Sequence, residues 1–138
     1  MGGGRQAKAG AWSVVLVDDD DAAAEMYRMG LQASHFEVRI ARDVEGLFAA
    51  LEHAIPDILV LDWLLPGVRG DEILERVRID ERTRALPVFM LSNFPAEKDG
   101  VIDRVFLAGA LAWLEKSKTT PATLAERLAE ALVALRRS

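Results

Sequence analysis

The stretch Asp57-Ile58-Leu59-Val60-Leu61-Asp62 places four consecutive apolar residues before a carboxylate. A short run without polar residues is typical of a β-strand that is covered on both faces of a parallel sheet. Two further runs, residues 13–17 and 87–91, are nearly as apolar. We therefore expect these three segments to be the central strands, and the more polar segments 37–41 and 110–114 to complete the sheet.

Segments of helical period alternate with these strands, and we predict helices over residues 22–33, 44–53, 71–78, 96–108 and 121–135. The last has the clearest signals, since Thr120 can cap it, Pro121 suits its first turn, and its leucines recur at helical spacing. Five alternating strand and helix units predict an α/β fold with a doubly wound, five-stranded parallel sheet. Such sheets bind ligands at the carboxyl ends of their strands.

Length and composition limit the functions that the chain can have. The 138 residues, half of them apolar, suffice for one domain, which we expect over residues 12–138, and the glycine-rich residues 1–11 read as a flexible tail or a cloning remnant. Without cysteine there is no disulfide, thiolate metal site or thiol chemistry, which suits the cytoplasm. The net charge of −5 argues against a nucleic-acid surface, and no apolar run approaches the ~20 residues that span a membrane.

The first predicted strand leads directly into four carboxylates, Asp18 to Asp21. Acids favour the start of a helix, and that reading accounts for Asp20 and Asp21. Asp18 and Asp19 lie at the strand end itself, where a hard cation such as Mg²⁺ would relieve their repulsion.

The third predicted strand also ends in an acid, Asp62. Taken alone, Asp62 is a turn residue before Pro66 and Gly67. However, two neighbouring central strands that both end in carboxylates would converge on one negatively charged pocket, and such a pocket needs a cation. Ser92 ends the fourth strand and Lys116 follows the fifth. An acid nucleophile, a metal cluster, a hydroxyl donor and a fixed positive charge together suit phosphoryl transfer.

Residues 14 to 135 resemble the receiver domain of bacterial response regulators, the CheY-like superfamily. The resemblance rests on an ordered set of motifs: Val15-Leu16-Val17-Asp18-Asp19, then residues 57–62 with Pro66-Gly67 and Gly70, then residues 87–92, and finally Gly109-Ala110 before Trp113-Leu114-Glu115-Lys116. Each motif alone is weak, but their order, with thirty residues between Asp62 and Ser92, is specific. The resemblance implies a flavodoxin-like (βα)5 fold with strand order 2-1-3-4-5.

The same resemblance implies the role of each acid. Asp62 would be the phosphoacceptor. The carboxylates of Asp19 and Asp62 and the main-chain carbonyl of Leu64 would bind Mg²⁺, while Asp18 would act mostly through water.

Three further roles follow from the resemblance. Ser92 would hydrogen-bond a phosphoryl oxygen, and Lys116 would pair with the phosphoryl group. Trp113 stands where the family has a Tyr or Phe whose rotamer follows the hydroxyl residue, so Ser92 and Trp113 would form the output switch. The donor would be a sensor histidine kinase or a phosphotransfer protein, and the domain would not be a turnover enzyme.

The chain departs from the family pattern around Ser92 and Lys116. Ser117 replaces the proline that usually follows the lysine with a cis bond, and a cis bond to a non-proline residue costs ~3 kcal/mol. Asn93 replaces a small residue, Trp113 is larger than the usual aromatic, and the stretch between Ser92 and Lys116 is longer than usual. An alternative is therefore a pseudo-receiver, an interaction module that works without phosphorylation.

Other classes fit less well. An aspartyl phosphohydrolase would need a second acid two residues after Asp62, where Leu64 stands. The two histidines, His35 and His53, lie in helical or loop contexts, which do not suit a histidine phosphocarrier or a His-ligated metal site.

The predicted fourth helix carries more apolar residues than one buried face requires: Val101, Ile102, Val105, Phe106 and Leu107. They form either a broad core face or, with the fifth strand and fifth helix, a surface for a downstream partner or a second copy. The sequence leaves open whether the domain stands alone.

Overall fold

The computed structural model describes residues 11–94 and 101–137, and the segment predicted as a tail lies outside this part except for Ala11. The chain forms the following elements: β1 Ser13–Val17, α2 Asp21–Ala33, β2 Glu37–Ala41, α3 Val44–His53, β3 Ile58–Asp62, β4 Leu64–Leu65, β5 Val68–Arg69, α4 Gly70–Ile79, β6 Val88–Ser92, α5 Val101–Leu107, β7 Ala110–Glu115, a 3-10 helix Lys116–Lys118, and α6 Pro121–Arg136.

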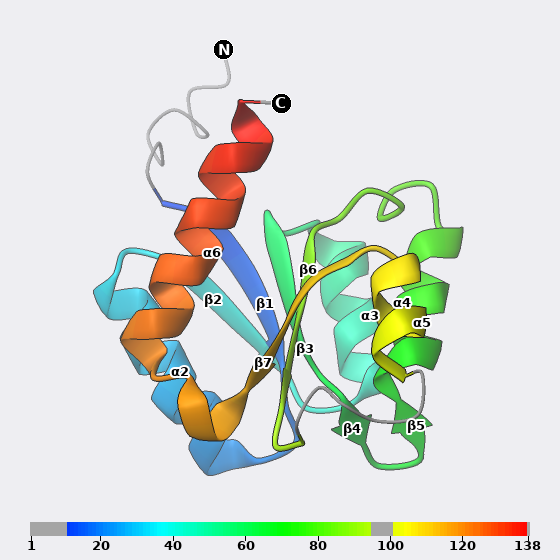
Figure 1. Ribbon diagram of the computed structural model, residues 1–138, viewed down its shortest axis with the longest axis horizontal. Coiled ribbons are helices and arrows are strands. Elements are labelled where there is room, and N and C mark those ends of the chain that lie inside the picture. Colours follow the sequence, from blue (N-terminus) through cyan, green and yellow to red (C-terminus); the bar gives the residue numbers. More distant parts are fainter. Residues whose placement is uncertain (1–10, 95–100, 138) are drawn as a thin grey trace.

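The five long strands form one parallel sheet in the order β2-β1-β3-β6-β7. This is the predicted 2-1-3-4-5 order, counted over the strands of the main sheet. The three most apolar strands β1, β3 and β6 are the central ones, as their composition predicted, because each must be covered on both faces. Helices α2 and α6 cover one face, and α3, α4 and α5 cover the other (Figure 1).

Two hydrophobic cores result from the alternation of side chains along the strands. In β1, Val15 and Val17 face the core beneath α3, α4 and α5, whereas Val14 and Leu16 face the core beneath α2 and α6. All four are at most 1% exposed. The cores hold the strands rigidly, so the residues that follow each strand are held at one edge of the sheet.

The structure also adds details to the predicted elements. A short antiparallel hairpin, β4 with β5, follows β3 and was not predicted. The 3-10 helix begins at Lys116, and among the described residues no peptide bond is cis, so the Lys116–Ser117 bond is trans. The predicted helix over residues 96–108 is described only from Val101 onward. In the part of the chain that is described, no helix has the length and apolarity to cross a membrane.

Candidate functional site

The four consecutive acids after β1 divide into two pairs with different surroundings. Asp20 caps α2, since its side chain accepts hydrogen bonds from the amides of Ala22 and Ala23, and Asp21 begins the helix and pairs with Arg42. Their predicted role at a helix start is confirmed. Asp18 is buried at 1% exposure, and its Oδ1 accepts a hydrogen bond from the Asp20 amide at 2.9 Å.

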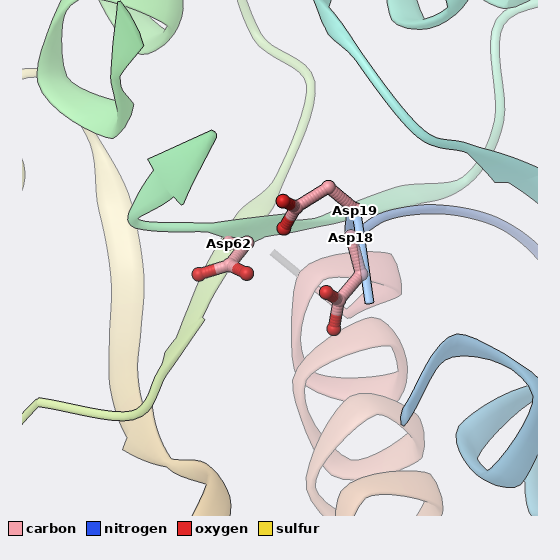
Figure 2. Close-up of side chains that lie close together, drawn as sticks. All are labelled: Asp18, Asp19 and Asp62. Atoms are coloured by element: carbon pink, nitrogen blue, oxygen red, sulfur yellow. The ribbon is translucent and has the colours of Figure 1, made fainter. Parts of the chain in front are cut away.

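Asp18, Asp19 and Asp62 come together at the ends of β1 and β3 (Figure 2). Each offers a carboxylate oxygen, and these atoms lie within 4.8 Å of one another. Asp18 and Asp62 are buried, whereas Asp19 is exposed. Three oxygen donors with one side open to water fit a hard cation such as Mg²⁺, which binds through a few carboxylates and retains water.

Lys116 reaches the same cluster from the end of β7. Its Nζ lies 2.7 Å from Asp18 Oδ2 and 3.2 Å from Asp62 Oδ2. The lysine side chain is 10% exposed, so the attraction is only weakly screened by water. The Lys116 ammonium, at 2.7 Å, is what compensates the charge of the buried Asp18 Oδ2.

Burial and the neighbouring charges shift the pKa values of Asp62 and Lys116. Burial raises the pKa of Asp62 from 3.8 to about 6; the positive charge of Lys116 opposes this rise and the negative charge of Asp18 adds to it. Burial disfavours the charged form of Lys116, but the hydrogen bond and charge of Asp18, with those of Asp62, outweigh it and raise the pKa of Lys116. At neutral pH the site therefore contains the Lys116 cation beside an Asp62 carboxylate that is mostly ionised.

Ser92 ends β6, next to Asp62, because Leu91 pairs with Asp62 across the sheet. It is 1% exposed, and its hydroxyl accepts a hydrogen bond from the Phe94 amide at 3.1 Å. The side chain of Asn93 is exposed. Leu64, the predicted source of a metal-binding carbonyl, is anchored to Asp62 because its amide donates to Asp62 Oδ1 at 3.2 Å.

Trp113 lies on β7 and is partly buried. Its indole Nε1 donates a hydrogen bond to the Phe94 carbonyl at 3.0 Å, and its ring lies 5.3 Å from the ring of Trp63, centroid to centroid. Trp63 directly follows Asp62. Trp113 therefore contacts both the loop after Ser92 and the residue after Asp62.

Sequence reasoning missed two residues near the site, Trp63 and Tyr27. Trp63 is buried at 8% exposure beside Trp113, and a large aromatic directly after the strand-end acid was its only signal. Tyr27 of α2 is 1% exposed, and its hydroxyl reaches the loop that follows Lys116. It is the only tyrosine of the chain, at a core position of a helix, and that was its only signal.

Exposed apolar side chains lie on α5, β7 and α6: Phe106, Leu107, Leu111 and Leu135. Val105 is fully buried, whereas Leu107 is 87% exposed, so the apolar residues of α5 do exceed one buried face. The side chains of Val101 and Ile102 lie outside the described part. Arg104 of α5 forms an ion pair with the buried Asp71 at the start of α4.

Comparison with known proteins finds a matching family and several relatives. The family described as response regulator receiver domain matches residues 14–129. The chain is 34% identical over 112 residues to the phosphate regulon transcriptional regulatory protein PhoB of Rhizobium meliloti, an alignment covering 81% of this chain and 48% of PhoB. It is 31% identical over 110 residues to the polar-differentiation response regulator DivK of Brucella ovis, covering 79% of this chain and 87% of DivK.

Solved structures agree with this similarity. The chemotaxis response regulator CheY4 of Vibrio cholerae superposes with a TM-score of 0.76 at 27% identity, covering 87% of this chain and 98% of CheY4. The chain spans about half the length of some curated relatives that it matches, PhoB of Rhizobium meliloti and TrcR of Mycobacterium tuberculosis among them.

Proposed function

We propose that this chain, which belongs to the response regulator receiver domain family, receives a phosphoryl group on Asp62 and signals by a change in partner binding. The observation that supports this assignment is the convergence of Asp18, Asp19 and Asp62 on one site with Lys116 reaching into it. Mg²⁺ would be held by Asp19, Asp62 and the carbonyl of Leu64, with Asp18 acting mostly through water.

The residues of the site have distinct tasks in this proposal. A carboxylate oxygen of Asp62 attacks the phosphorus atom while the bond between phosphorus and the donor breaks, which leaves an aspartyl phosphate. Lys116 and the Ser92 hydroxyl stabilise the phosphoryl oxygens, where negative charge collects in the transition state. A bound Mg²⁺ would supply further positive charge there. Since the pKa of Asp62 is about 6, the carboxylate is mostly ionised and nucleophilic at neutral pH.

The donor would be a sensor histidine kinase or a phosphotransfer protein, and the domain would act as a regulatory acceptor rather than a turnover enzyme. Output would pass through the face of α5, β7 and α6, where Leu107 and Leu111 are exposed, to a downstream protein or a second copy. The switch would link Ser92 to Trp113 through Phe94, which is hydrogen-bonded to both.

Incubation with acetyl phosphate and Mg²⁺ tests the assignment of Asp62. The parent protein should gain the mass of one phosphoryl group, and the gain should disappear when Mg²⁺ is chelated. Asp62→Asn keeps the size of the side chain and should gain no mass. A phosphorylated Asp62→Asn variant, detected by intact-mass spectrometry, would assign the acceptor elsewhere.

Mg²⁺ should raise the melting temperature of the parent protein, because an ion that binds only the folded state shifts unfolding by mass action. Asp19→Ala should remove this response, since it takes away the exposed carboxylate of the cluster. The measurement is a thermal melt over a Mg²⁺ titration, with Ca²⁺-free buffer and chelator as the reference. A parent melt that ignores Mg²⁺ would instead support an interaction module that works without phosphorylation.

The output switch should be visible in tryptophan emission. A beryllofluoride adduct with Mg²⁺ should draw Ser92 toward Asp62, disturb its hydrogen bond with the Phe94 amide, and move the Trp113 indole that Phe94 holds. Emission should therefore change on adduct formation. Trp113→Phe should lose most of that change, whereas Trp12→Phe should retain it. Equal changes in the parent and in Trp113→Phe would remove Trp113 from the switch.

A further inference from the structure

The backbone turn that carries Lys116 is not held in place by the two side chains at its centre. Lys116 is the first residue of the 3-10 helix Lys116–Lys118, and the turn is closed by a hydrogen bond from the Thr119 amide to the Lys116 carbonyl at 3.3 Å. Ser117 and Lys118 are exposed. The position of the Lys116 ammonium therefore depends on contacts that neighbouring elements make with this turn.

Tyr27 of α2 makes such a contact. Its hydroxyl lies 2.7 Å from the Thr119 carbonyl oxygen and 3.4 Å from the Lys116 carbonyl oxygen. A hydroxyl has one proton, so it donates to Thr119 and makes a weaker contact with Lys116. Burial raises the pKa of Tyr27, and the nearby charge of Lys116 offsets this only in part, so the hydroxyl remains a donor at neutral pH.

Helix α2 also fixes the far end of the same turn. Gly30 lies one helical turn after Tyr27, and a Cβ atom at Gly30 would come 2.1 Å from Pro121 Cβ, at the start of α6. The two helices therefore approach closely where the turn ends. Helix α2 therefore holds the turn at two points. The Tyr27 hydroxyl contacts the carbonyls of Lys116 and Thr119, and the backbone of Gly30 packs against Pro121 at the start of α6.

We propose that Tyr27 is a positioning residue for Lys116: by holding the Thr119 and Lys116 carbonyls, it keeps the all-trans turn in the conformation that directs the ammonium to Asp18 and Asp62. The part that concerns phosphoryl transfer rests on the proposed function, while the placement of Lys116 does not. In this chain a side chain from α2 thus stabilises a turn that has Ser117 after its lysine.

Tyr27→Phe removes only the hydroxyl and leaves the buried ring in place. Thr83→Val is a matched control, because Thr83 is also 1% exposed and its hydroxyl also donates to a main-chain carbonyl, that of Val77, at 2.6 Å. Thr83 precedes β6, at the opposite end of the strands from the site. Each variant loses one buried hydrogen bond, so both should unfold somewhat more easily and to a similar extent.

The first measurement is the rate of phosphorylation by acetyl phosphate with saturating Mg²⁺, followed by intact mass. Tyr27→Phe should react about 10-fold more slowly, since small displacements of a group that stabilises the transition state are costly. Thr83→Val should react at the parent rate.

The second measurement needs no phosphorylation. Lys116 is reductively methylated and its methylation is measured by peptide mass spectrometry, with the exposed Lys118 as internal reference.

Tyr27→Phe should increase methylation of Lys116 relative to Lys118 several-fold, and Thr83→Val should leave the ratio unchanged. The proposal is overturned if Tyr27→Phe keeps the parent ratio or if Thr83→Val raises the ratio equally. It is also overturned if the ratio rises in Tyr27→Phe while this variant and the parent protein gain the phosphoryl group equally fast. If the parent gains no phosphoryl group, the proposed function fails, and the methylation ratio alone decides whether Tyr27 places Lys116.

Discussion

Replacing Lys116 with methionine is expected to lower the free energy of unfolding of the metal-free protein by about 3–5 kcal/mol at neutral pH. The substitution keeps the length of the side chain but leaves Asp18 and Asp62 buried without the cation that lies 2.7 Å and 3.2 Å from their oxygens. An uncompensated buried carboxylate is costly, whereas a lost surface ion pair is not. Urea denaturation with a chelator present measures the difference.

Lys118→Met provides the matched control two residues away. The Lys118 side chain is 75% exposed, and its Nζ lies 3.7 Å from Glu115 Oε2, so this variant should stay within about 0.5 kcal/mol of the parent. Mg²⁺ should restore part of the stability of Lys116→Met, because a second cation can compensate the same carboxylates. If the two methionine variants were equally stable, Lys116 would not compensate the site as the distances indicate.

The fold could be predicted because its signals are local. The unbroken apolar runs identified β1, β3 and β6 as central strands, and the capping residue Thr120 located the start of α6. The carboxylates could be predicted for the same reason: Asp18 and Asp62 directly follow buried strands, and parallel strands end at one edge of a sheet.

The remaining features depend on contacts between distant segments or on very short elements. The Tyr27 hydroxyl and the Thr119 carbonyl are separated by 92 residues, and no local pattern couples them. The contact between Trp63 and Trp113 depends on the position of β7 at the edge of the sheet, next to β6. The β4 and β5 strands have two residues each, which is too short for any periodicity.

Without metal, the stability of the parent protein relative to Asp62→Asn should fall by about 2 kcal/mol as the pH rises from about 4 to about 7. The pKa of Asp62 is about 6 in the folded state against 3.8 as the reference for the unfolded chain, because burial disfavours its charge. Between these values the folded state holds a proton that the unfolded chain has lost. Raising the pH removes that proton and ionises a buried carboxylate, so folding becomes less favourable.

Paired urea titrations of the parent and Asp62→Asn across this pH range, with chelator, measure the effect, because contributions from the other acids largely cancel in the difference. A difference that stays constant with pH would show that Asp62 does not titrate abnormally. Saturating Mg²⁺ should reverse the trend, since a cation binds the ionised carboxylate and stabilises the parent more at about pH 7 than at about pH 4. The charge that destabilises the metal-free protein is therefore the same charge that would bind the metal and attack the phosphoryl donor.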